Sequence, residues 1–233
     1  MHAYTMRIKK NCKRIIIRII NGEVVVTAPP YVKKKTIDSF VESKDDWIES
    51  NLAVDKRKFT AVKDLTSIYL FGIKHAVHFI NSGRKTIGIK KEDAFIVIDT
   101  PLTTEDEKII AALKNWLKKM ATQYVEQRIA FLTTREDVAS ITNRYMEKWR
   151  VRYMKTAFGL CYAQKHEIVL NVELVLYPPQ FLDYVILHEI THFLHQNHSK
   201  QYYQAFEQLE PQWKRLKQEL NQWHKEHGGW SYR

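Results

Sequence analysis

Two histidines four residues apart, with a glutamate directly after the first, constrain the fold of this chain more than any other feature. They stand in the segment His188-Glu189-Ile190-Thr191-His192. Residues four apart lie on one face of a helix, so both imidazoles can reach a single ion. Glu189 lies beside that ion, where it can take a proton from a zinc-bound water. The segment therefore predicts a helix with two zinc ligands, His188 and His192, and a catalytic base, Glu189.

The residues around this motif also predict a buried helix. Pro178 and Pro179 favour a turn followed by a helix start, because proline is tolerated in the first helical turn. Apolar residues then recur at helical spacing; they are Leu182, Val185, Ile186, Leu187, Ile190, Phe193 and Leu194. We therefore expect a rigid apolar helix that ends near Asn197, since asparagine often closes helices.

Zinc in a hydrolase usually has three protein ligands and one open position, so the motif needs a third ligand. His198 follows the expected helix end at Asn197, and a chain that folds back there presents its side chain. Ser199 can then cap a further helix that reaches about Leu209. His198 is accordingly the predicted third ligand.

Two alternatives to His198 remain open. One is a glutamate of the following helix, Glu207 or Glu210. The other is His195, although a straight helix carries it about one turn beyond the ion. The spacing of the three histidines also matches the metzincin pattern, which has glycine in place of His195 and a methionine turn after the third histidine. Because the last methionine is Met154, upstream of the motif, the metzincin class is excluded.

The motif and its surroundings resemble the YgjP-like metallopeptidase family, which is related to the SprT-like and WLM zinc peptidases. The resemblance extends over most of the chain, and it is carried by residues 188–192, by Asn197-His198-Ser199 and by the upstream segments 178–179 and 183–185. It implies an opening β-hairpin, a long central helix and a strand at 168–171. Carried over by position, it also implies zinc ligands at His188, His192 and His198, with Glu189 as the catalytic base.

Two segments depart from the family pattern. Where the family shows Arg-Trp-Gly-Ser-Cys, this chain has Ala157-Phe158-Gly159-Leu160-Cys161. The family's Phe-Trp after the third histidine is Tyr202-Tyr203 here. We therefore expect an intact metal site next to an altered substrate-facing strand.

The fold class that follows is α+β. We expect a zincin-like catalytic domain, built from a long scaffold helix, a small antiparallel sheet and the motif helix, after an N-terminal region rich in β-hairpins. A chain of 233 residues can bury a good core in this way. The expected division is residues 1–101 for the β-rich region with one helix and 102–233 for the metallopeptidase domain.

Hydrophobic periodicity outside the motif predicts the remaining elements. Expected strands are 14–20 and 24–28, in a hairpin around Asn21-Gly22, followed by 68–80, 86–89 and 94–98 in an antiparallel arrangement. Expected helices are 35–52, 103–132 and a C-terminal stretch interrupted at Pro211. The long helix 103–132 should pack against the motif helix.

The net charge of +11, from 37 basic and 26 acidic residues, favours an anionic partner such as nucleic acid, a nucleotide or an acidic peptide. Between Trp149 and Tyr153, apolar residues alternate with Arg150 and Arg152. This pattern predicts a half-buried strand with one basic face. That face either binds a phosphate or carboxylate or simply meets water.

Other features bear on the compartment. No apolar run is long enough to span a membrane, and residues 1–6 lack the apolar core of a signal peptide. Cys12 and Cys161 lie far apart in the sequence and are expected as free thiols of a reducing compartment. We therefore expect a cytoplasmic protein without a membrane partner.

The leading functional hypothesis is a zinc-dependent metallohydrolase, most simply a metallopeptidase that acts on peptides or proteins. Glu189 would be the general base for a zinc-activated water. Tyr202, Tyr203 or His195 would be candidate donors to the developing anion.

Two other hypotheses remain open at this point. One is a metal-dependent hydrolase of nucleotides or phosphoanhydrides, with Arg150 and Arg152 binding the substrate. The other is a noncatalytic basic protein that binds nucleic acid and holds a structural zinc. A structural site would need a fourth protein ligand, such as His195 or Glu207.

Overall fold

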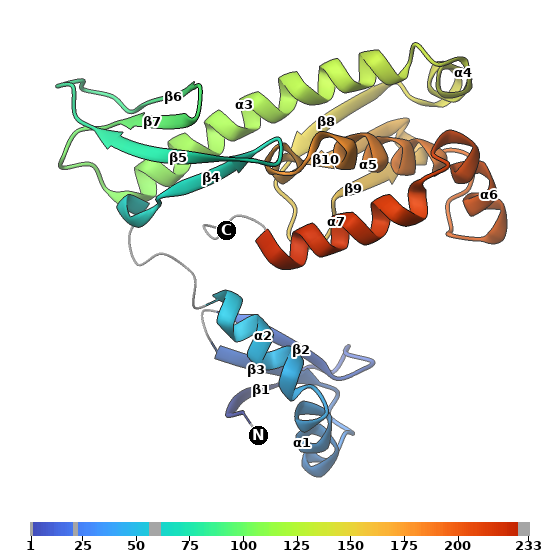
Figure 1. The fold of residues 1–233 in the computed structure, drawn as a ribbon. Coiled ribbons are helices and arrows are strands. Elements are labelled where there is room, and N and C mark those ends of the chain that lie inside the picture. The colour runs from blue at the N-terminus through green and yellow to red at the C-terminus, as the bar shows by residue number, and fades with distance from the viewer. Residues whose placement is uncertain (1, 21–22, 56–61, 228–233) are drawn as a thin grey trace. The chain divides into compact units, whose positions relative to one another are not determined.

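The computed structural model describes residues 2–20, 23–55 and 62–227, and Figure 1 shows their fold. The chain divides into two compact units, with the division between residues 60 and 61. The described residues form seven α-helices and three small sheets, so the predicted α+β class is confirmed. None of these helices is both long and apolar enough to cross a membrane. The predicted boundary near residue 101 lies inside the second unit, which begins before the sheet of residues 67–99.

The first unit contains a three-stranded sheet. Its strands are β1 (Tyr4–Ile8), β2 (Ile16–Ile20) and β3 (Glu23–Ala28). The central strand β3 is antiparallel to β2, as predicted, and parallel to β1, which was not predicted. The expected turn at Asn21-Gly22 lies outside the described residues. Alternate residues of β3 point to one face of the sheet, where Val24, Val26 and Ala28 are buried in the core of this unit.

Two helices, α1 (Lys34–Glu42) and α2 (Asp45–Asp55), supply the other half of that core through Ile37, Val41 and Ile48. The prediction of one helix over 35–52 was therefore wrong. The break lies at Ser43-Lys44, where the hydroxyl of Ser43 donates to the carbonyl of Phe40 at 2.8 Å. Such a bond competes with the helical backbone pattern, and the acidic pair Asp45-Asp46 then starts a new helix.

The second unit begins with a four-stranded sheet in the order β4-β5-β7-β6. Its strands are β4 (Ser67–Leu70), β5 (Ile73–Ile80), β6 (Gly88–Glu92) and β7 (Phe95–Asp99). The predicted strand 68–80 turns at Phe71-Gly72, where φ is 53° and 77°. The purely antiparallel arrangement was also wrong, because β6 takes the sheet edge and β7 then enters beside β5 in the same direction.

The long helix α3 (Asp106–Leu132) runs along the second unit and contacts the motif helix α5 (Pro179–Thr191), as predicted (Figure 1). One stripe of α3 is buried in the core of the second unit: Ile109, Leu113, Leu117, Ala121, Val125, Ile129 and Leu132. The guanidinium of Arg128 on α3 donates two hydrogen bonds, of 2.8 and 2.7 Å, to the carboxylate of Asp183 on α5. This bidentate pair fixes one helix against the other.

A small mixed sheet lies beside the motif helix, in the order β8-β10-β9. Its strands are β8 (Lys148–Arg152), β9 (Gly159–Tyr162) and β10 (Glu167–Asn171). The sheet was predicted to be antiparallel, but β10 is parallel to β8 and antiparallel to β9. The chain first forms the outer strand β9, and β10 then enters the sheet between β8 and β9. Every residue of β10 is buried, while β9 has a paired strand on one side only.

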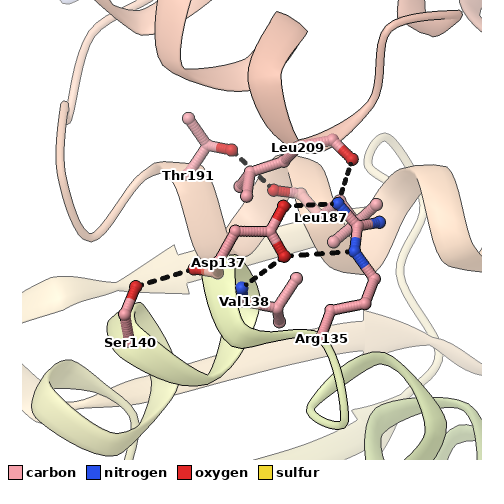
Figure 2. A network of polar contacts seen from close by, with 7 residues as sticks. All are labelled: Arg135, Asp137, Val138, Ser140, Leu187, Thr191 and Leu209. Atoms are coloured by element: carbon pink, nitrogen blue, oxygen red, sulfur yellow. Dashed lines mark hydrogen bonds and ion pairs between the residues drawn. The ribbon is translucent and has the colours of Figure 1, made fainter.

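The remaining helices of the second unit are α4 (Glu136–Tyr145), α6 (Lys200–Leu209) and α7 (Trp213–His227), with a break at Pro211 as predicted. Figure 2 shows how α4 and α6 are joined. The guanidinium of Arg135 donates to the carboxylate of Asp137 and, at 2.7 Å, to the carbonyl of Leu209. A cation at a helix end satisfies carbonyls that the helix leaves unpaired. Arg135 thereby connects the start of α4 with the end of α6.

Candidate metal centre

The motif helix ends earlier than the sequence predicted. Helix α5 stops at Thr191, and His192 is its C-cap residue. The amides of His192, Phe193 and Leu194 donate to carbonyls three residues earlier, which tightens the chain into a turn. The expected helix end at Asn197 was therefore wrong. His188 and His192 still lie on one face, with ring centroids 4.9 Å apart.

His198 comes back to this pair through the turn. Its Nε2 lies 3.1 Å from Nε2 of His188, and one ring nitrogen from each of the three histidines lies within 4.8 Å of the others. Ligands about 2.05 Å from a tetrahedral zinc ion are about 3.4 Å apart. The three ring nitrogens are thus spaced for one shared ion. Ser199 caps α6 through a bond from the amide of Tyr202, as the sequence predicted.

In both histidines of the motif, the ring nitrogen Nδ1 takes part in a hydrogen bond. Nδ1 of His192 lies 3.0 Å from the carbonyl of His195, to which it donates. Nδ1 of His188 lies 2.7 Å from the hydroxyl of Tyr202, which itself donates to the carbonyl of His188 at 3.2 Å. When the phenol donates its single proton to the carbonyl, Nδ1 of His188 is the donor in the shorter contact. In both rings this leaves the Nε2 lone pair free for a metal.

Desolvation at the site favours the neutral form of the three imidazoles. It lowers the pKa of His188 to about 3, with further lowering from His192 and His198. Burial also lowers the pKa of His192 and of His198. Neutral imidazole is the form that binds a metal ion, so all three residues are in their ligand form at neutral pH.

Aromatic rings of α6 and α7 surround the histidines. The ring of Tyr203 stacks on His198 at a centroid distance of 6.0 Å and on Trp213 at 4.7 Å. Tyr202 and Phe206 are fully buried next to His188. This shell excludes water from one side of the site and leaves the other side open.

The carboxyl group of Glu189 lies against strand β9. A Cβ atom built on Gly159 would stand 2.5 Å from Oε1 of Glu189, so only glycine leaves room for this side chain. Burial raises the pKa of Glu189 to about 8, and a backbone hydrogen bond from Cys161 acts in the opposite direction. The carboxyl group is therefore held between the histidines and the edge strand.

A cleft of about 550 Å³ opens over these groups. One wall is strand β9 with the residues that follow it, and the floor contains His188, Glu189 and His192. The other wall comes from Gln196, Asn197 and His198, in the turn after the motif. The three histidines and the glutamate thus share one solvent-accessible cavity.

The other residues considered as ligands lie elsewhere. The carboxylate of Glu207 pairs with Lys214 at 3.6 Å, and that of Glu210 accepts from the amide of Gln212. His195 contributes its backbone carbonyl to His192. Within the described part of the chain, the group of potential metal ligands at the site consists of the three histidines.

Sequence reasoning missed two contributions. Tyr202 was considered as a donor to a reaction intermediate, but its hydroxyl is buried and bonded to His188. Gly159 was expected in the strand beside the site, but its close contact with Glu189 was not predicted. The basic strand is also less open than predicted, because Arg150 pairs with Glu167 at 2.9 Å.

Comparison with known proteins agrees with this geometry. Residues 13–223 match the model of the YgjP-like metallopeptidase domain. No curated protein and no solved structure matches the chain. The family model covers most of the sequence, including both sides of the cleft and all three histidines. The chain therefore belongs to the YgjP-like metallopeptidase family.

Proposed function

We propose that this protein is a zinc-dependent metallopeptidase of the HExxH type. In this proposal His188, His192 and His198 hold the ion, and Glu189 is the general base. The observation that carries it is the meeting of three neutral imidazoles with one buried carboxyl group at the floor of a single cleft. Three protein ligands are typical of catalytic zinc, whereas structural zinc has four.

A bound zinc ion would polarise the scissile carbonyl and make water a better nucleophile at neutral pH. The positive charge of that ion would also lower the raised pKa of Glu189, so that its carboxylate could take the proton of the attacking water and pass it to the leaving amine. Its carboxyl group is positioned for this by Gly159 and by the backbone bond from Cys161. Tyr202 and the carbonyl of His195 hold the motif histidines while the substrate binds.

Strand β9 suits a peptide or protein substrate. It lines the cleft and is paired with β10 on one side only, so its other edge offers backbone donors and acceptors. An extended peptide can add to such an edge as a further strand. We infer that substrate lies along β9, with its scissile bond next to Glu189.

The alternative of phosphoanhydride hydrolysis has less support. It rested on the net positive charge and on a basic strand with Arg150 and Arg152, and Arg150 is paired with Glu167. A panel of nucleotides, measured beside a panel of peptides, is the comparison that separates the two reactions.

We place the protein in the cytoplasm, where Cys12 and Cys161, both free in the structure, stay reduced.

The test is metal content and peptide hydrolysis in the wild type and three variants. We expect about one zinc per chain in the wild type and in Glu189→Gln, with activity of Glu189→Gln lowered by roughly 10²- to 10⁴-fold. His198→Ala should lose zinc. His195→Ala is the matched control and should keep it, because only its backbone takes part. A wild type that binds no zinc after reconstitution, or an active Glu189→Gln, would refute the proposal.

A further inference from the structure

The first unit carries a concentration of positive charge that the metal centre does not use. Residues 7–35 contain nine lysines and arginines and a single acidic residue, Glu23. The nine are Arg7, Lys9, Lys10, Lys13, Arg14, Arg18, Lys33, Lys34 and Lys35, and all are exposed. None of them forms an ion pair with another residue that the structure describes. Their charge is therefore available to a partner.

Two of these cations lie on the face of the sheet that points away from the helices. Arg7 is opposite Thr27 in the register of β1 with β3, and Arg18 is opposite Val25 in the register of β2 with β3. Side chains alternate along a strand, and Val26 belongs to the core formed with the helices. Arg7 and Arg18 consequently flank β3 on the face away from the helices.

The other seven cations gather at one end of the same sheet. The amide of Lys9 donates to the carbonyl of Ala28 at 3.0 Å, so the loop after β1 and the turn after β3 lie together. The loop carries Lys9, Lys10, Lys13 and Arg14, and Lys33 to Lys35 follow the turn. Tyr31, in that turn, is 74% exposed. An exposed aromatic ring among cations is typical of a surface for single-stranded nucleic acid.

We propose that this basic surface, made of the nine cations and Tyr31, binds single-stranded nucleic acid. The cations contact the phosphates, and an unstacked base packs on the ring of Tyr31. A membrane would need apolar groups on the same face as the charge. The exposed apolar residues of β1, Met6 and Ile8, alternate with Arg7 and point to the opposite face. The proposal is independent of the proposed peptidase activity.

The test is fluorescence anisotropy of a labelled 20-nucleotide single strand with the full-length protein at several salt concentrations. A variant with Lys9→Gln, Lys10→Gln and Lys13→Gln removes three charges from the surface. Its matched control, Lys85→Gln, Lys118→Gln and Lys119→Gln, removes three exposed charges from the second unit. Tyr31→Ala tests stacking, and vesicles that contain phosphatidylserine and a DNA duplex are the competing partners.

We expect wild-type binding that weakens with salt, and a triple loop variant whose slope of log K against log salt is smaller by about two. The control triple variant should keep the wild-type slope. Tyr31→Ala should bind roughly tenfold more weakly at an unchanged slope. The proposal is overturned if the wild type does not bind the strand, or if both triple variants weaken equally. It also fails if duplex or vesicles bind better and Tyr31→Ala has no effect.

Discussion

Tyr202 links the orientation of one proposed ligand to the packing of a neighbouring helix. Its ring is fully buried in α6, and its hydroxyl bonds both Nδ1 and the carbonyl of His188. Burial raises the pKa of this phenol, so the hydroxyl keeps its proton. This hydroxyl favours the His188 tautomer with the proton on Nδ1, which leaves the lone pair of Nε2 free on the side of the other two histidines.

We predict that Tyr202→Phe weakens zinc binding by about 10- to 100-fold, since it removes this bond and keeps the ring. Zinc affinity measured by competition with a chelator checks the prediction. Tyr203→Phe is the control, because Tyr203 contacts His198 by stacking, which phenylalanine preserves. Equal affinities in Tyr202→Phe and the wild type would show that the hydroxyl does not orient His188.

Gly159 acts on the glutamate and not on the histidines. A methyl group there would meet Oε1, Cγ and Cδ of Glu189 at 2.5, 2.7 and 2.8 Å. Glu189 is only 5% exposed, so its side chain has little room to yield. The contact therefore makes the position of the carboxyl group depend on the absence of a side chain in β9.

We predict that Gly159→Ala lowers kcat for peptide hydrolysis by about 100-fold while zinc content stays at the wild-type level, since small displacements of a catalytic group have effects of this size. Steady-state kinetics and metal analysis of the same sample check it. Gln164→Ala, at another position that lines the cleft, should leave kcat within a few-fold. Loss of zinc in Gly159→Ala would mean that the strand supports the ligands instead.

At the scale of elements, the position of α6 decides whether the site is complete. This helix follows His198 directly and carries Tyr202. Its far end is held by Arg135, which donates to the carbonyl of Leu209 at the last residue of the helix (Figure 2). Arg135 thus holds the far end of the helix that follows the proposed ligand His198.

We predict that Arg135→Gln lowers the free energy of unfolding by about 1 kcal/mol, because a charge-assisted bond to a helix end is lost. Urea unfolding of the full chain measures it. Arg215→Gln, which removes an exposed pair with Glu219, should change stability by less than about 0.5 kcal/mol. Equal losses in both variants would contradict a specific role for Arg135.

The pairing of Arg135 with Asp137 also predicts that the free energy of unfolding depends on pH. The hydrogen bond from Arg135 is the main cause of the lowered pKa of Asp137, whose ordinary value is 3.8. A lowered carboxyl pKa stabilises the fold above that value, and the contribution is lost as pH falls through the folded-state pKa. The stability difference between the wild type and Asp137→Asn should thus be largest near neutral pH and shrink below pH 3.8. Urea unfolding at several pH values checks this, and a constant difference would contradict it.

At the scale of the whole molecule, the proposed zinc ligands belong to one unit. His188, His192 and His198 all lie in the second unit, and a ligand that binds only the folded state stabilises what it contacts. At free zinc 1,000 times above Kd, the stabilisation is about 4 kcal/mol. The turn between α5 and α6 should gain most from it.

We predict that removal of zinc with a chelator increases hydrogen exchange in residues 188–202 and leaves the sheet β1–β3 unchanged. Exchange measured by mass spectrometry, segment by segment, checks this. Restoration of protection by added zinc is the control. An equal increase in β1–β3 would show that the two units unfold together.

What could be predicted from the sequence depended on how local the interaction was. His188 and His192 lie on one face because of the period of a helix. The cap at Ser199 follows from local spacing as well, since its hydroxyl accepts from the amide of Tyr202, three residues later. The hairpin β2–β3 and the helix α3 likewise follow from periodicity within one segment. The break between α1 and α2 did not, because the apolar pattern continues through Ser43 and gives no sign of a helix end there.

The rest of the site was decided by tertiary structure. The length of α5, the contact of Gly159 with Glu189 and the bond from Tyr202 to His188 all join groups that only packing brings together. No spacing along the chain encodes these distances, because they depend on how β9 and α6 lie against α5. The sequence by itself determined which side chains can serve a metal and a proton transfer. The tertiary structure determined their orientation, since hydrogen bonds to Nδ1 of His188 and of His192 decide which ring nitrogen of each is free.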